Sequence, residues 1–358
     1  MPNHREMINK ESLNEKWIND VAKKQKSDPI LVEKVIRALY LLETLKLTNL
    51  KFIFKGGTAL MLMLPEPKRF SIDIDIIVPD KSQDIESYLD QVIQNSDFIE
   101  YKLNERKAKS NIEKAHYKFY YKPVTNARAE SEYILLDVLY ENSHYGEHTN
   151  EIPVNSSFLL FEGENVLVTV PLPEAILGDK LTAYAPNTTG IPYGRDKEVE
   201  IIKQLFDIGQ LFDIVDNVDV ISNVFDQFAK TELKYRELDQ LPSNVLEDTY
   251  QTGIVIGTRG KSGEGKFDEL QKGIQNIRNF IFSESFHLDR AMIPAAKAAY
   301  ITAVLRTNEK ELKRYTDPKE MAEWNIEQPF ETRLNKLKKS NPEAFFYWYQ
   351  TFELMTRL

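Results

Sequence analysis

Residues 70–78 read FSIDIDIIV, a short apolar run that contains two carboxylates, Asp73 and Asp75. Its isoleucines and valine predict a β-strand, because β-branched residues favour extended backbone. Side chains alternate across a strand, so Ser71, Asp73 and Asp75 would share one face and the isoleucines would point into a core. Mg²⁺ suits such a pair of acids, since it takes one or two carboxylates and completes its shell with water and substrate phosphates. The alternative is an exposed sheet face on which both carboxylates meet water.

A glycine pair, Gly56-Gly57, lies upstream, between a strand predicted at 51–54 and a helix predicted from Thr58. Glycine lets the backbone approach a ligand closely, and the N-terminus of a helix offers free N–H groups that favour phosphate. Thr58 would add a hydroxyl. The alternative is a plain tight turn. With the acidic strand, however, the turn predicts a phosphate site beside a metal site.

A third carboxylate, Asp137, lies in the segment YILLDVLY, which predicts a strand over 133–140. Asp137 would share a face with Leu135 and Leu139, and an acid in so apolar a strand needs a partner. It is a candidate for a third metal ligand, or for the base that takes a proton from an acceptor hydroxyl. The alternative is an aspartate that caps a neighbouring loop.

The remaining pattern predicts an α+β fold followed by helices. Ser27-Asp28-Pro29 predicts the start of a helix, with Asp28 as N-cap. Further strands are predicted at 98–103, 117–121 and 166–170, and helices at 174–184 and 196–212. Helical periodicity dominates from about residue 215. We therefore predict an α/β domain over 1–214 with N-terminal helices, and a helical domain over 215–358.

Composition restricts the cellular compartment and the kinds of binding partner that we expect for this chain. The 358 residues contain no cysteine, which excludes disulfides and thiolate metal sites and fits a cytoplasmic protein. No signal peptide and no apolar run near the length of a membrane span are visible. The net charge is -9, so a nucleic-acid partner would have to meet a local basic surface. Residues 114–128, KAHYKFYYKPVTNAR, would stack on and track RNA, or would form a half-exposed strand pair.

Two further sequence features give weaker indications of function. Residues 260–266 match G-x-x-x-x-G-K, but a phosphate-binding loop needs Ser or Thr next and a strand before it. Phe267 stands at the next position, so RGKSGEGK (259–266) is interpreted as an exposed loop. The histidines show no spacing typical of metal ligands.

The segments KGGTAL and KRFSIDIDI (55–60 and 68–76) resemble the first motif of the polymerase-β-like nucleotidyltransferase superfamily. Within it, the match resembles the AbiEii/AbiGii toxin family, which includes the MenT-type toxins and combines the glycine turn with R-x-S-x-D-[IL]-D. Asp137 matches the family's second motif, and Lys180 in ILGDKLTAY resembles its third. The fourth, K-D-[LI]-[YF]-D-[LI], appears as KQLFDI at 203–208, with Lys203 and Asp207 in place and Gln204 where an acid is usual.

The resemblance spans about residues 52–212 and implies a polymerase-β-like domain with a mixed sheet. It implies transfer of a nucleoside monophosphate from an NTP to an acceptor, with release of pyrophosphate and with Mg²⁺ or Mn²⁺ as cofactor. The acceptor would be RNA, such as tRNA, and the chain would be the toxin of a toxin–antitoxin or phage-defence system, with a separate antitoxin protein as partner. The implied catalytic residues are Asp73, Asp75, Asp137, Lys180 and Asp207. The implied NTP-binding residues are Gly56, Gly57, Thr58, Arg69, Ser71 and Lys180. The implied metal ligands are Asp73, Asp75 and Asp137.

Two alternatives stay open at this stage. The chain would bind NTPs without turnover and act through its partner contacts, or it would modify a protein or a small molecule such as an antibiotic. All three carboxylates are present, so nothing in the sequence indicates lost activity.

Overall fold

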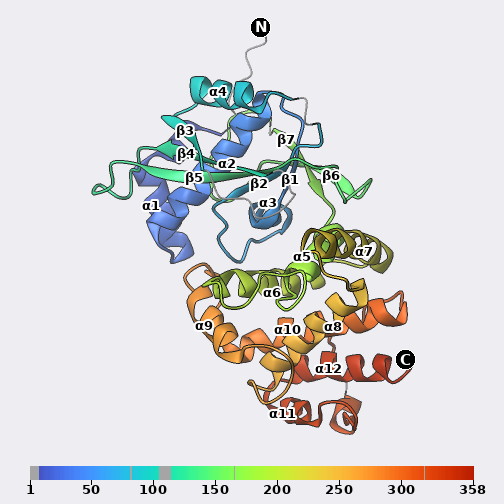
Figure 1. The fold of residues 1–358 in the computed structure, drawn as a ribbon. Coiled ribbons are helices and arrows are strands. Elements are labelled where there is room, and N and C mark those ends of the chain that lie inside the picture. The colour runs from blue at the N-terminus through green and yellow to red at the C-terminus, as the bar shows by residue number, and fades with distance from the viewer. Residues whose placement is uncertain (1–7, 81–82, 105–113, 165, 318) are drawn as a thin grey trace. The chain divides into compact units, whose positions relative to one another are not determined.

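The computed structural model describes residues 8–80, 83–104, 114–164, 166–317 and 319–358 (Figure 1). The chain forms two compact units. The first consists of Met1–Leu172 with the short segment Phe280–Glu284, and the second of Pro173–Asn279 with Ser285–Leu358.

The first unit is built on a mixed sheet, which has five strands among the described residues, in the order β1-β2-β5-β4-β3. Strands β2 and β5 run parallel, and the other neighbouring pairs are antiparallel. A separate antiparallel pair joins β6 to β7. The strands are β1 (Ile53–Lys55), β2 (Ile74–Ile77), β3 (Glu100–Leu103), β4 (Lys114–Tyr121), β5 (Glu132–Leu139), β6 (Thr149–Pro153) and β7 (Leu167–Pro171). The helices of this unit are η1 (Lys10–Leu13), α1 (Glu15–Gln25), α2 (Pro29–Leu47), α3 (Gly56–Met63) and α4 (Ile85–Asn95).

Helix α2 crosses one face of this sheet (Figure 1). It begins as predicted: the Asp28 side chain accepts a hydrogen bond from Ile30 N at 2.9 Å, and Pro29 occupies the first helical position. Its predicted apolar positions, which include Val32 and Leu39, are fully buried. Removal of this apolar surface from water is the main force that holds the helix on the sheet.

Strands β4 and β5 bury alternate side chains. Tyr117, Phe119 and Tyr121 of β4 and alternate residues of β5 such as Leu136 are buried in the core of this unit. The other face of both strands is only partly covered. The interpretation of 114–121 as a half-exposed strand is therefore confirmed, and the same alternation leaves Asp137 on the open face.

The segment Phe280–Glu284 returns to the first unit from far along the chain. Phe70 N donates to the carbonyl oxygen of Phe280 at 2.7 Å, and the rings of Phe70 and Phe282 lie 4.5 Å apart. Strand β2 begins only at Ile74, later than predicted, because residues 69–70 bond to this segment instead of to a neighbouring strand of the sheet.

The second unit is helical. Helices α5 and α6 pack against each other, and α7, α9 and α10 pack against one or the other of them. The predicted boundary between residues 214 and 215 thus differs from the start of this compact unit, which lies at Pro173. Among the described helices, none has the length and apolarity needed to cross a bilayer. The elements are α5 (Pro173–Ala183), α6 (Glu198–Phe212), α7 (Val218–Tyr235), α8 (Pro242–Gly257), α9 (Phe267–Ile277), α10 (Leu288–Thr307), η2 (Lys319–Ala322), η3 (Thr332–Lys336), α11 (Leu337–Ser340) and α12 (Pro342–Met355).

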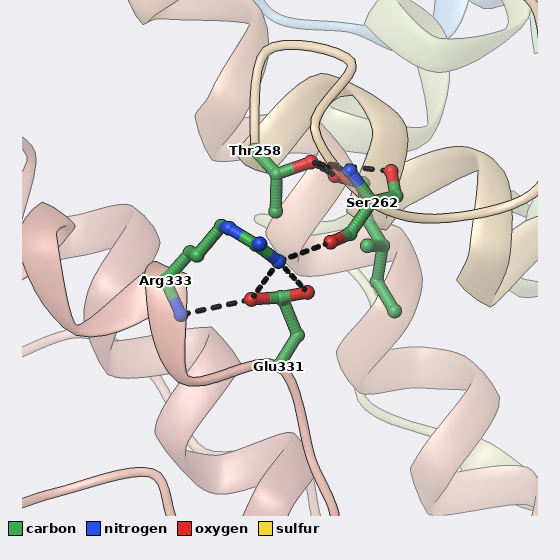
Figure 2. A network of polar contacts seen from close by, with 5 residues as sticks. Thr258, Ser262, Glu331 and Arg333 are labelled. Carbon is green, nitrogen blue, oxygen red and sulfur yellow. Dashed lines mark hydrogen bonds and ion pairs between the residues drawn. The ribbon is translucent and has the colours of Figure 1, made fainter.

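The RGKSGEGK segment joins α8 to α9, so a helix and not a strand precedes it. Figure 2 shows how Arg333 of η3 holds this loop: its Nη1 donates to Ser262 Oγ at 2.8 Å and lies 3.2 Å from Glu331 Oε2. Ser262 N donates in turn to Thr258 Oγ1 at 3.1 Å. The loop is fixed by structural contacts, which agrees with its exclusion as a phosphate-binding loop.

Candidate functional site

The glycine turn lies where β1 ends and α3 begins. Gly56 has φ +79°, in the left-handed region that side chains disfavour. A Cβ placed on Gly56 would lie 2.0 Å from Oδ2 of Asp75. The Asp75 carboxylate therefore packs directly against the backbone at the start of α3, which only glycine permits. The predicted close approach of a ligand to this backbone stays a prediction.

The second glycine faces a different pair of side chains. A Cβ on Gly57 would lie 2.6 Å from both Arg69 Nη2 and Ser71 Oγ. Arg69 is buried, and its Nη1 donates to the carbonyl oxygen of Phe70 at 2.9 Å. The glycine pair thus gathers Arg69, Ser71 and Asp75 around one turn, although Arg69 supports it from a buried position.

Thr58 is also buried and lies in the first turn of α3. Its hydroxyl donates to the carbonyl oxygen of Asp73 at 2.6 Å. In this structure Thr58 therefore positions the backbone of Asp73, which precedes the first paired residue of β2, Ile74. Contact between Thr58 and a nucleotide stays a prediction.

The strand register places four polar side chains side by side on the open face of the sheet. Lys55 pairs with Asp75, Asp75 with Asp137, and Asp137 with His116, across β1, β2, β5 and β4. Adjacent strands lie about 4.8 Å apart, so the two carboxylates are immediate neighbours. Asp137 keeps 30% of its side chain exposed. Asp75 and Asp137 are thus adjacent in the structure, and their role as shared metal ligands stays a prediction.

His116 is a member of this row that sequence reasoning missed. Its Nδ1 lies 2.6 Å from Oδ1 of Asp137, within hydrogen-bond distance. His116 stands at no metal-ligand spacing from another histidine, so the sequence pattern does not single it out. The sequence does show that His116 shares a face of β4 with Lys118 and Tyr120, which indicates a polar face. Only the register between β4 and β5 identifies Asp137 as its partner.

Lys180 and Asp207 form a second cluster, within the helical unit. Lys180 Nζ lies 2.7 Å from Asp207 Oδ2 and donates to Gln204 Oε1 at 3.0 Å. Both charged side chains are almost completely buried, with Asp207 only 1% exposed. Lys203 pairs instead with Glu200, at 2.9 Å. The structure therefore brings Lys180, Gln204 and Asp207 together, while the glycines, Arg69, Ser71 and the other three aspartates belong to the first unit.

The donor set around Asp75 and Asp137 suits a hard cation such as Mg²⁺, because both neighbours offer carboxylate oxygens. Within the described ranges, no group of three or more acidic or histidine side chains is arranged to hold a metal ion by itself. Two adjacent carboxylates would leave positions for water and for substrate phosphates, as Mg²⁺ usually requires. The residues present therefore fit a cation that is shared with a bound nucleotide.

The chain as a whole is similar to known proteins. Residues 38–318 match a family model described as "Nucleotidyl transferase AbiEii toxin, Type IV TA system". Among solved structures, the chain is similar to JHP933 from Helicobacter pylori (15% identity, TM-score 0.44, covering 83% of this chain and 96% of that one). It is also similar to MenT4, the nucleotidyltransferase toxin Rv2826c from Mycobacterium tuberculosis H37Rv (13%, 0.40, 78% and 89%). A comparison with curated proteins finds no match.

Proposed function

The chain belongs to the AbiEii family of nucleotidyl transferase toxins from type IV toxin–antitoxin systems, and from this premise we propose that the open face of its sheet transfers a nucleoside monophosphate from an NTP to RNA. The observation that carries the proposal is the contact between Gly56 and Asp75, with Asp137 as the next residue across the sheet. The turn has no side chains, so phosphate groups can approach its backbone, and the paired carboxylates beside it can bind the cation. Together they suit an NTP and its cation.

Each residue of the turn has a proposed task. Gly56 and Gly57 leave room for phosphate oxygens to approach the N–H groups at the start of α3, and Ser71 Oγ, which lies against Gly57, adds a donor. Asp73, Asp75 and Asp137 are the proposed ligands of Mg²⁺ or Mn²⁺; Asp75 and Asp137 are register partners, and phosphate oxygens of the NTP would complete the set, since the described carboxylates do not form a three-ligand site by themselves. When bound, this cation would supply charge neutralisation for the acceptor oxygen and for the departing pyrophosphate. Arg69 would add positive charge from its buried position.

In the reaction, the acceptor hydroxyl oxygen bonds to the α-phosphorus of the NTP as the bond to the pyrophosphate oxygen breaks. Asp137, on the open face, would take the hydroxyl proton, and His116 would orient its carboxylate through the 2.6 Å contact. Preorganised groups of this kind supply most of the rate in phosphoryl transfer, since the protein adds little covalent chemistry.

Lys180 and Asp207 are kept as proposed site residues. Lys180 would serve the triphosphate tail, as a compact charge on a flexible stem suits phosphate. Asp207 and Gln204 would fix the position of its ammonium group. We propose that the protein acts in the cytoplasm, with tRNA as the acceptor and a separate antitoxin protein as its partner. Labelling with each of the four NTPs would identify the NTP that it prefers.

Incubation with each radiolabelled NTP, Mg²⁺, and total cellular RNA or protein tests the proposal. We expect label to enter RNA, and Asp75→Asn and Asp137→Asn to abolish labelling while the fold is kept. Asp239→Asn, in an exposed loop of the second unit, is the matched control and should label normally. Label in protein alone would contradict the RNA acceptor, and labelling that survives both site changes would contradict the site.

A further inference from the structure

The open face of β4 and β5 carries aromatic and basic side chains that the transfer reaction leaves unassigned. Tyr120 pairs with Tyr133, and Lys118 pairs with Leu135, on the face that also carries His116 and Asp137. On the edge strand β3, Lys102 pairs with Lys118. We call Tyr120, Tyr133, Lys102 and Lys118 the tyrosine platform. Tyr133 is 40% exposed, unusually open for a large aromatic residue in a strand.

The rings of the platform are held by neighbouring cations. Lys118 Nζ lies 4.5 Å from the centroid of the Tyr133 ring, and Lys102 Nζ lies 5.1 Å from that of Tyr120. The two tyrosine centroids are 5.9 Å apart, and the rings are tilted by 56°. Tyr133 is thus an exposed ring and Tyr120 a partly exposed one, and each has a lysine ammonium group beside it.

Lysines gather on the platform and beside it, although the chain as a whole is acidic. The protein carries a net charge of -9, yet Lys102 and Lys118 lie in the platform and Lys114 extends the same face of β4. Glu100 pairs with Lys102 at 2.7 Å, but both side chains are about half exposed, so the pair is weak. Asp137 and Asp75 bound the platform on the side of the site. The lysines therefore offer a polyanion a local basic surface, although the net charge of the whole chain is negative.

We infer that the tyrosine platform seats the single-stranded end of the RNA acceptor, an inference that rests on the proposed function. Bases of a single strand stack on aromatic side chains while lysines follow the phosphates. Tyr133 precedes Asp137 by four residues on β5, a distance of about 13 Å. A strand end that stacks on the two tyrosines is thereby directed toward the carboxylates. Stacking tolerates every base, so the platform selects single strands and not a sequence.

Binding without catalysis tests this inference. Fluorescence anisotropy in metal-free buffer would measure affinity for a labelled single-stranded RNA of about 12 nucleotides and for its duplex. We expect Tyr120→Leu and Tyr133→Leu each to weaken single-strand binding roughly 5- to 150-fold, the value of one stacked base. Tyr120→Phe and Tyr133→Phe keep the aromatic face and should bind normally, which separates stacking from damage to the fold. Duplex binding should be weaker than single-strand binding.

The contribution of the Lys118 charge to RNA binding is measured separately, from the salt dependence of the affinity. Lys118→Met should lower the slope of log affinity against log salt by about 0.7, the loss of one phosphate contact on a single strand. Two controls should change nothing: Leu103→Ala, an exposed apolar residue that pairs with the buried Tyr117 and so belongs to the other face, and Lys16→Met, an exposed lysine on α1.

The outcomes separate this inference from the proposed function. If RNA is labelled but the leucine variants bind it as the wild type does, the platform is overturned and the transfer function stands. If RNA binds through the platform but label enters only protein, RNA binding by the platform is supported and the proposal that RNA is the acceptor is contradicted. If the wild type has no affinity for single-stranded RNA, or prefers DNA or duplex, the inference is overturned.

Discussion

Gly56→Ala tests the turn between β1 and α3, because the structure allows its two costs to be separated. The first is backbone strain: with φ +79°, a residue with a Cβ costs about 1–2 kcal/mol. The second is a clash, since the new Cβ would lie 2.0 Å from Asp75 Oδ2, whereas ordinary contact begins at 3.4 Å. The carboxylate oxygen would have to move by about 1.4 Å, the difference between these distances.

A displacement of about 1 Å at a reacting centre can cost 100-fold in rate. We therefore expect Gly56→Ala to transfer label to RNA at least about 100-fold more slowly, while its free energy of unfolding falls by about 1–2 kcal/mol from strain and by about 1–3 kcal/mol more from the clash. The rate would be followed with radiolabelled NTP at saturating Mg²⁺, and stability by urea denaturation.

Gly146→Ala is the matched control. Gly146 also has a left-handed backbone, with φ +57°, but a Cβ added there would meet no described atom within 4 Å beyond its chain neighbours. It should lose only the stability that backbone strain costs, about 1–2 kcal/mol, and keep full transfer activity. If the two variants transfer at the same rate, whether both fast or both slow, the link between the Gly56 contact and catalysis is refuted.

Three other changes have defined outcomes. Lys180→Met leaves Asp207 buried without its ammonium partner, so urea denaturation should show a loss of about 3–5 kcal/mol; Lys230→Met, which removes an exposed pair, should cost about 0–1 kcal/mol. His116→Ala should raise the Mg²⁺ concentration for half-maximal transfer about 10- to 100-fold and leave the thermal midpoint nearly unchanged; an unaltered Mg²⁺ titration would contradict its role. Burial raises the pKa of Tyr250 to about 12, so the folded state favours the neutral phenol, and stability present below pH 10 is lost as pH rises toward 12. Guanidinium denaturation of Tyr250→Phe should therefore show a smaller alkaline loss than the wild type, by about 2–3 kcal/mol.

Much of the fold was predictable wherever local pattern and burial agree. The strand predicted over 133–140 agrees with β5 to within one residue at each end, because the segment is a short run of mostly apolar residues, and its burial alternates along the element. The first turn of α2 was specified by its cap at Asp28. Strand β6 escaped prediction: its sequence, TNEIP, is polar and ends in proline, and it forms by pairing with β7.

The site was predictable in its residue types but not in its geometry. Alternation on a strand predicts that Asp75 shares a face with Ser71 and Asp73, and that Asp137 lies between Leu135 and Leu139 on its own strand. The structure adds that the two aspartates are register partners. Lys55 and His116 complete the row only through pairing between strands, which a single sequence does not display. The late start of β2 depends on residues 280–281, about two hundred positions away, so the pattern of 70–78 alone could not indicate it.

Burial explains why Gln204 departs from the family pattern without disturbing its neighbours. Lys180 already has one carboxylate partner, Asp207, and the pair is almost closed to solvent. A second acid at 204 would add a negative charge beside a pair that is already neutral, and an excess buried charge is costly. The amide oxygen of Gln204 accepts the ammonium proton at 3.0 Å without that charge. Asp207 would thus act through Lys180, whereas Asp137, whose side chain is 30% exposed, would be open to direct contact with a substrate.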